Sequence, residues 1–222
     1  MRSVSALIFD FDGTLIDSSD GVVEAVNYSL RQLGQPEQPA EVIKRYIGFP
    51  LSQMYPDFTS APLSELYRHF QVKAVDSVVE ATTPLEGADA LVAKLKEQGY
   101  RMAIATTKRK QHVDAILDRL NWRGFFGAAV GGDEVSRVKP DPEALAIAIK
   151  RLGAHASESL MIGDTVNDVL AARAMGMRVA AVSSPYGRRD ELVKSGPDFF
   201  LEEICELQQL LERLNNASRG VI

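Results

Sequence analysis

Short continuous runs of apolar residues, each closed by a polar turn, recur along the chain. The first occupies residues 5–10 (SALIFD). Runs of this kind are typical of strands that are buried on both faces, as in a parallel sheet covered by helices. Four later segments share the pattern, at residues 101–106, 128–131, 160–163 and 179–182. The pattern therefore predicts five buried strands.

Amphipathic helical patterns separate these runs. Residues 88–98 place Leu91 and Leu95 on one face and stop before Gly99, which suits the end of a helix. Similar patterns cover residues 112–120, 142–152 and 168–175. Strand and helix alternate from residue 87 onward, so we expect an α/β fold with a doubly wound, mainly parallel (Rossmann-like) sheet. The final residues, 215–222, show no periodicity and are expected to be frayed.

One stretch interrupts this alternation. Between residues 17 and 82 the pattern indicates helices and no strand, with helical pieces at residues 25–33, 39–46, 51–55 and 62–79. A helical insertion after the first strand is most economically a separate small domain. We therefore expect a core domain made of residues 1–16 and 83–222, and an all-helical cap domain made of residues 17–82.

Composition and charge exclude several classes of protein. The 222 residues are 45% hydrophobic, which is ample for a core, and their net charge of −5 argues against a nucleic-acid partner. No apolar run approaches the roughly 18 residues that a membrane span needs. The single cysteine, Cys205, excludes a disulfide scaffold and a cysteine-based zinc site. Without a signal peptide or a membrane segment, the expected location is cytoplasmic.

Polar residues gather just beyond the carboxyl ends of the predicted strands, where open α/β sheets bind ligands. They are Asp10, Asp12, Thr106, Thr107, Asp164 and Asp168, with Lys139 ahead of a helix. Four carboxylates in one pocket would repel one another and raise their pKa values. A hard divalent cation resolves that conflict, and Mg²⁺ prefers carboxylates, water and a phosphate oxygen. The sequence therefore indicates a magnesium site.

These segments resemble the haloacid dehalogenase superfamily of phosphohydrolases. Four motifs carry the resemblance in order, IFDFDGT, AIATT, VKPDP and MIGDTVND, with a helical insertion after the first. The resemblance implies that Asp10 is the nucleophile that takes the phosphoryl group as an aspartyl-phosphate. It implies that Asp12 protonates the leaving oxygen and then deprotonates the attacking water. It further implies that Asp10, Asp164 and the backbone carbonyl of Asp12 hold Mg²⁺.

The remaining roles follow from the same resemblance. Thr106 and Lys139 would bind the transferring phosphoryl group. Thr107 stands where relatives commonly carry Asn, and its backbone N–H could still serve the phosphoryl group. Asp168 would lie behind the metal ligands or contact a metal-bound water. Gly48 would mark the substrate loop of the cap.

The subclass is indicated by Asp12, since branches that cleave halides or phosphonates lack an acid there. The segment FDGTLIDS, with residues 46–51 and 185–187, resembles phosphoglycolate-phosphatase-like enzymes. The expected activity is Mg²⁺-dependent hydrolysis of a small phosphorylated metabolite by a monomer or homodimer.

Three alternatives stay open. A phosphosugar mutase of the β-phosphoglucomutase type carries an arginine three residues after the glycine that matches Gly48, whereas this chain has Leu51. An inorganic pyrophosphatase of the same fold and a non-catalytic binding protein are the other two.

Two further groups of side chains have unsettled roles. The cap cations either meet an anionic substrate or are solvated, and they are Lys44, Arg45, Arg68 and Lys73. The three histidines are expected at the surface or on helix faces, with His69 the one candidate for substrate contact; they are His69, His112 and His155.

Overall fold

Six parallel strands form the centre of the computed structural model, which describes residues 3–186 and 189–218. Their order across the sheet is β5 (Ala128–Val130), β4 (Arg101–Ala105), β1 (Ala6–Phe9), β6 (Ser159–Gly163), β7 (Arg178–Val182) and β8 (Phe199–Leu201). Phe9 of β1 is paired with Ile104 on one side and Ile162 on the other. The predicted α/β class with a doubly wound parallel sheet is confirmed.

Both faces of the sheet are buried because successive side chains of each strand enter two different clusters. Leu7 and Phe9 pack with helices α5, α6 and α10, whereas Ala6 and Ile8 pack with α7, α8 and α9. The bounds of these helices are α5 Ala88–Glu97, α6 Lys110–Arg119, α7 Glu143–Leu152, α8 Val166–Ala174, α9 Arg189–Lys194 and α10 Leu207–Ser218. Three short 3-10 helices join them: η1 Gly132–Glu134, η2 Ala156–Glu158 and η3 Ile204–Glu206.

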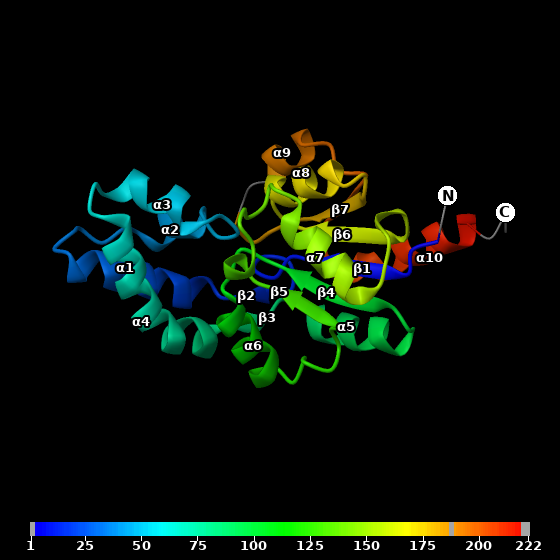
Figure 1. Cartoon of the computed structure of the whole chain (residues 1–222), viewed down its shortest axis with the longest axis horizontal. Helices are drawn as coiled ribbons and strands as arrows, with labels where there is room; N and C mark the ends of the chain where they lie inside the picture. The colour runs from blue at the N-terminus through cyan, green and yellow to red at the C-terminus, as the bar shows by residue number, and fades with distance from the viewer. Residues whose placement is uncertain (1–2, 187–188, 219–222) are drawn as a thin grey trace.

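A group of four helices lies to one side of the sheet, at the left of Figure 1. They are α1 (Ser19–Gln32), α2 (Ala40–Lys44), α3 (Leu51–Phe58) and α4 (Leu63–Ala81). Val26, Leu30 and Tyr55 are buried in the apolar cluster that these helices form. We call α1–α4 with their loops the cap; its exact limits at residues 17 and 82 remain a prediction.

The connection between cap and core contains two strands that the sequence analysis missed. β2 (Ile16–Asp17) and β3 (Thr83–Pro84) form an antiparallel pair. The expectation of no strand between residues 17 and 82 is therefore wrong at Asp17. A strand of two residues is too short to show a period, so hydrophobic patterning could not reveal it.

The expectation of a frayed tail is wrong for residues 215–218, which belong to α10. The Asn215 side chain links this helix to the segment just before β1, because its Oδ1 accepts a hydrogen bond from the Val4 N–H at 2.7 Å. Its Nδ2 also donates to the Val4 carbonyl at 3.2 Å. Residues 219–222 of the tail, and Gly187 of the 185–187 segment, lie outside the described residues.

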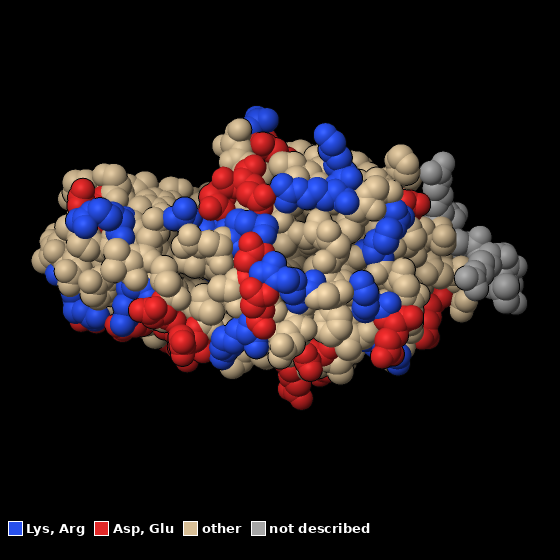
Figure 2. Space-filling model, turned by 60° about the horizontal axis from the view of Figure 1, so that its bottom comes forward, with Lys and Arg blue, Asp and Glu red and all other residues tan. Residues whose placement is uncertain are grey.

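In the described part of the chain, no helix combines the length and apolar character needed to cross a membrane. On the face in Figure 2, basic and acidic residues are interspersed, and no strongly basic area forms there.

Candidate active site

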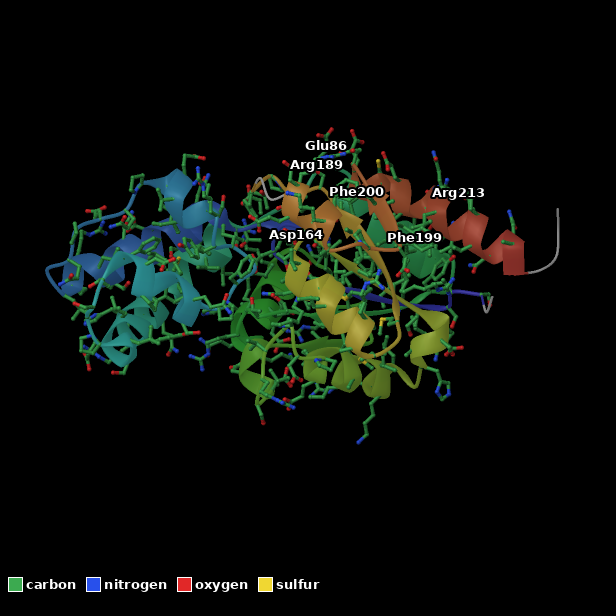
Figure 3. All side chains as sticks on the ribbon, turned by 90° about the horizontal axis from the view of Figure 1, so that it is seen from above. Glu86, Asp164, Arg189, Phe199, Phe200 and Arg213 are labelled. Atoms are coloured by element: carbon green, nitrogen blue, oxygen red, sulfur yellow. The ribbon has the colours of Figure 1, made fainter. Side chains whose placement is uncertain are left out.

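The site lies at the carboxyl end of the central strands. β1 is flanked by β4 and β6, so the loops that follow these three strands meet. Asp10 directly follows β1, and its backbone N–H donates to the Ile162 carbonyl at 2.8 Å. Asp164, which follows β6, is labelled in Figure 3 on the side of the core that faces the cap. Six residues singled out from the sequence are buried here: Asp10, Asp12, Thr106, Lys139, Asp164 and Asp168.

Lys139 is the cation at the centre of this site. Its Nζ lies 2.9 Å from Oδ1 of Asp10 and 2.6 Å from Oδ1 of Asp168. Burial alone would lower the pKa of Lys139, but the attraction of these two carboxylates outweighs burial and raises the pKa above its ordinary value. Lys139 therefore carries its charge inside the protein.

Three carboxylates converge beside this lysine. Oxygens of Asp10, Asp164 and Asp168 lie within 4.8 Å of one another, and all three side chains are buried. Burial raises the pKa of Asp10 to about 7, with Lys139 opposing the shift and Asp168 adding to it. Burial also raises the pKa of Asp164 well above its usual value, and the charges of Asp10 and Asp168 act in the same direction.

The same carboxylates fit a magnesium ion. Oδ2 of Asp10 is buried and has no hydrogen-bond partner among the described residues, so a ligand position stands open. Hard oxygen donors with an excess of negative charge are what Mg²⁺ selects. The sequence named Asp10, Asp164 and the Asp12 carbonyl as ligands. The structure adds the Asp168 carboxylate to the first two, although Lys139 already engages that group.

Asp164 is held in place by the turn after β1. The Thr14 hydroxyl donates to Oδ1 of Asp164 at 2.9 Å. Gly13 has a φ of +77°, and a Cβ at that position would lie 2.2 Å from Oδ2 of Asp164. Only glycine therefore allows the turn to approach Asp164 this closely. Thr14 was not identified as a site residue from the sequence, although its place in IFDFDGT was the available signal.

Asp168 is oriented by the start of α8. Its Oδ2 accepts from the backbone N–H of Thr165 at 3.0 Å and from the Thr165 hydroxyl at 2.7 Å. Thr165 is the N-cap residue of this helix. Because one oxygen of Asp168 is used by Thr165, the other is directed to Lys139.

Asp12 has a separate environment made by two residues that the sequence analysis did not assign. The Ser18 hydroxyl donates to Oδ1 of Asp12 at 2.5 Å, and Nζ of Lys108 lies 3.1 Å from Oδ2. Lys108 also donates to Ser18 at 3.2 Å. Ser18 precedes α1 of the cap and Lys108 follows β4, so Asp12 is fixed from both parts of the protein.

The loop between α2 and α3 brings the cap into contact with the loops at the carboxyl end of the sheet. The Thr107 hydroxyl donates to the Gly48 carbonyl at 3.4 Å. Gly48 has a φ of +86°, and a Cβ there would lie 2.8 Å from Cγ2 of Thr165. Gly48 is thus packed against the core, and the Thr107 hydroxyl faces the cap loop. Thr106 is buried, with its Oγ1 accepting from the Lys108 N–H at 3.2 Å.

A cavity of about 420 Å³ lies between the cap and the core. The core residues at its floor include Asp12, Thr107, Lys108 and His112. His112 lies on a helix face, one of the two positions expected for the histidines, and its side chain is buried in α6. Burial lowers its pKa to about 4, and the nearby charges of Lys108 and Arg109 act in the same direction.

The basic side chains of the cap do not reach this cavity. Lys44 pairs with Asp20 at 3.0 Å, and Arg68 pairs with Glu65 at 2.7 Å. Lys73 lies 3.5 Å from Glu24. Neither these three residues nor Arg45 and His69 are among the described residues that line the cavity.

Comparison with known proteins places the chain in a family. Residues 7–182 match the family described as haloacid dehalogenase-like hydrolase. The chain is 32% identical over 208 residues to "Probable phosphatase IndB" of Dickeya dadantii (strain 3937), with 90% of each protein covered. It is 32% identical over 217 residues to "Pyrophosphatase PpaX" of Bacillus cereus (strain AH820), with 96% of this chain and 99% of the relative covered.

Among solved structures, the haloacid dehalogenase-like family protein SP0104 of Streptococcus pneumoniae superimposes with a TM-score of 0.86. The two are 25% identical, and the match covers 95% of this chain and 99% of the other. The resemblance seen in the four motifs is confirmed by these matches: the chain belongs to the haloacid dehalogenase-like hydrolases.

Proposed function

We propose that this protein is a Mg²⁺-dependent phosphatase that hydrolyses a phosphomonoester through an aspartyl-phosphate on Asp10. The observation that carries the proposal is the buried Lys139 between Asp10 and Asp168, beside an Asp10 oxygen that has no partner among the described residues. A binding protein would have no need to bury a nucleophilic carboxylate in this arrangement.

Charge neutralisation is the first requirement of the reaction. A carboxylate can approach a phosphoryl group only when the negative charge of the phosphate is offset. In the proposal, Lys139 supplies one positive charge and the Thr106 hydroxyl binds a phosphoryl oxygen. Asp10, Asp164 and the Asp12 carbonyl would hold Mg²⁺, with Asp168 beside them, and the ion would offset negative charge of the phosphoryl group.

The first step transfers the phosphoryl group to the protein. One carboxylate oxygen of Asp10 forms a bond to phosphorus while the bond from phosphorus to the ester oxygen breaks. Asp12 gives its proton to that oxygen, so the product leaves as an alcohol. Ser18 and Lys108 hold the Asp12 carboxyl group in place.

The second step hydrolyses the aspartyl-phosphate. Asp12, now deprotonated, takes a proton from water, and the water oxygen bonds to phosphorus. The bond from phosphorus to Asp10 breaks, which releases inorganic phosphate and restores the carboxylate. Division of the hydrolysis into two steps replaces one high barrier with two lower ones.

Relatives suggest compounds for a substrate panel. The sequence resemblance favours a small phosphoglycolate-like metabolite, and a relative named pyrophosphatase makes pyrophosphate the second candidate. A phosphosugar mutase stays an alternative, although Leu51 lines the cavity where that class carries arginine. The cytoplasmic location and the monomer or homodimer state remain predictions.

The experiment is phosphate release with Mg²⁺ and with chelator. The panel contains phosphoglycolate, pyrophosphate, sugar phosphates, nucleoside monophosphates and an aryl phosphate. We expect Asp10→Asn to lower turnover by on the order of 10³ or more. The matched control is Asp76→Asn, an exposed aspartate of α4, which should turn over like the wild type. Acid quenching with ³²P-labelled substrate should leave label on the wild-type protein and none on Asp10→Asn. Near-normal turnover by Asp10→Asn would contradict the covalent mechanism.

A further inference from the structure

We propose that the leaving group of the substrate is a bulky, uncharged and largely apolar alcohol, which binds in the cavity between cap and core. The inference rests on the proposed function and narrows its substrate class. It is carried by the position of the cavity, by the chemistry of its two walls and by its size.

The cavity lies on the leaving-group side of the reaction centre. Asp12, the residue proposed to protonate the leaving oxygen, is among its lining residues. Asp10, the proposed nucleophile, is not among the described residues that line it. An ester oxygen held next to Asp12 therefore directs its carbon substituent into this space.

The cap wall of the cavity carries no charge among the described residues. It contains the aromatic rings of Tyr46, Phe49, Tyr67 and Phe70, with aliphatic side chains around them. A wall of this kind gains free energy from apolar surface and none from a carboxylate or a phosphate.

The core wall does hold charges, but they are paired. Nζ of Lys108 lies 3.1 Å from Oδ2 of Asp12, and Nε of Arg109 lies 3.3 Å from Oδ2 of Asp133. While Asp12 is ionised, an anionic leaving group would compete with Asp12 and Asp133 for these two cations. His112 does not provide one near neutral pH, because burial keeps its pKa at about 4.

The size of the cavity agrees with this chemistry. Its volume of about 420 Å³ falls in the range of roughly 300–1,000 Å³ that accommodates drug-sized ligands. The glycolate part of phosphoglycolate, or the second phosphate of pyrophosphate, would leave most of the apolar wall in contact with water. A larger apolar group would cover that wall.

The first experiment compares n-alkyl phosphates from ethyl to hexyl, with Mg²⁺ present. Their leaving alcohols have closely similar acidity, so differences in kcat/KM report binding of the chain in the transition state. Each buried methylene should raise kcat/KM about fourfold. Isobutyl phosphate has nearly the shape of phosphoglycolate but an uncharged leaving group. Its kcat/KM should exceed that of phosphoglycolate by at least about tenfold, because the glycolate carboxylate has to be desolvated beside an apolar wall.

Two variants test the location. Leu51→Arg and Gln71→Arg each place a cation in the cavity wall, and Gln71 is already polar, so its variant carries the test where Leu51→Arg fails to fold. In both variants the ratio of kcat/KM for isobutyl phosphate to kcat/KM for phosphoglycolate should fall by more than about tenfold. The matched control is Val72→Arg on α4, where the native side chain is 61% exposed and outside the cavity lining; its ratio should equal the wild-type ratio.

The outcomes separate the two proposals. A flat or falling alkyl series, with faster hydrolysis of phosphoglycolate or pyrophosphate, overturns the apolar leaving group and leaves the phosphatase intact. If Val72→Arg changes the kcat/KM ratio of the two esters as much as Gln71→Arg does, the assignment of the leaving group to this cavity is overturned. No hydrolysis of any ester by the wild type with Mg²⁺ overturns the proposed function itself.

Discussion

Nζ of Lys139 lies 2.9 Å from Oδ1 of Asp10, and the two side chains are almost completely shielded from solvent. The same nitrogen lies 2.6 Å from Asp168, so one ammonium group serves two buried carboxylates. Asp164 adds a third carboxylate nearby. The site therefore holds three acidic groups and one basic group before any ligand binds, and its stability depends on the lysine.

Replacement of Lys139 should destabilise the fold as well as stop turnover. In Lys139→Met, Asp10 and Asp168 would be buried without their common partner, and loss of one member of a buried pair costs about 3–5 kcal/mol. Urea unfolding should show this loss at neutral pH. The double variant Lys139→Met/Asp168→Asn should recover part of the stability and none of the activity. Equal stabilities of Lys139→Met and wild type would contradict the structure of the site.

Magnesium should stabilise the protein against unfolding. If Asp10, Asp164 and Asp168 repel one another, a cation that binds only the folded state raises the free energy of unfolding, by about 2.7 kcal/mol at 100 times its Kd. Thermal unfolding with increasing Mg²⁺ should show a rising midpoint that chelator reverses. Asp164→Asn should weaken the effect, whereas the exposed Asp76→Asn should retain it. A wild-type unfolding midpoint that does not change with Mg²⁺ would count against the metal site.

The sequence predicted the parts of the fold that have long or repeated signals. The run at residues 5–10 contains the central strand Ala6–Phe9, in which every residue is apolar because both faces of a central strand are buried. β8 (Phe199–Leu201) was missed because three residues at the sheet edge show no period. α10 was missed although its apolar residues Leu207, Leu210 and Leu211 are buried, because its last residues, 215–218, carry no apolar period.

The site was predicted to a similar degree and for a similar reason. Asp10, Lys139, Asp164 and Asp168 stand in motifs at strand ends, and the structure brings them together. Ser18, Lys108 and His112 depend on how the cap meets the core. Pairing between distant segments leaves no local pattern in one sequence, so only coordinates could reveal Lys108 beside Asp12.

Loss of the acid at Asp12 should depend on the leaving group. Asp12→Asn cannot protonate the ester oxygen, so an alkyl phosphate should lose about 10²–10⁴ in kcat. An aryl phosphate with an acidic phenol needs little protonation and should lose much less in the first step. Single-turnover kinetics on both esters measures this difference. Equal losses on the two esters would indicate that Asp12 acts through structure alone.

The contact between Gly48 and Thr165 should tie cap position to activity. Gly48→Ala imposes a positive φ on alanine and places its Cβ 2.8 Å from Cγ2 of Thr165. Gly34→Ala is the matched control, because Gly34 also has a positive φ (+65°) but a Cβ there meets nothing within 4 Å. Both variants should lose about 1 kcal/mol or more of stability from backbone strain.

Only Gly48→Ala should also lower kcat/KM, since only its Cβ would push the cap loop away from Thr165 and the active site. Thr165→Ser removes Cγ2 and keeps the hydroxyl that bonds Asp168, so the double variant Gly48→Ala/Thr165→Ser should regain kcat/KM. Failure of this rescue, with the single variants behaving as stated, would show that strain at residue 48 and not the contact controls activity.

His112 should give the protein a stability that falls as the solution becomes acidic. Burial first, and then Lys108 and Arg109, lower its pKa from 6.5 to about 4, while Asp133 and Asp12 oppose the shift. Between these two pH values the unfolded chain binds the proton and the folded protein does not, so the free energy of unfolding decreases as pH falls through that range. One group contributes a slope of at most about 1.4 kcal/mol per pH unit.

Asp10 acts with the opposite sign, because its pKa is raised to about 7 and the folded state binds more protons than the unfolded chain. The comparison is therefore between wild type and His112→Gln, unfolded in urea with chelator from pH 4 to 7. The wild type should lose more stability toward pH 4 than the variant does, and parallel curves would show that His112 does not titrate across folding.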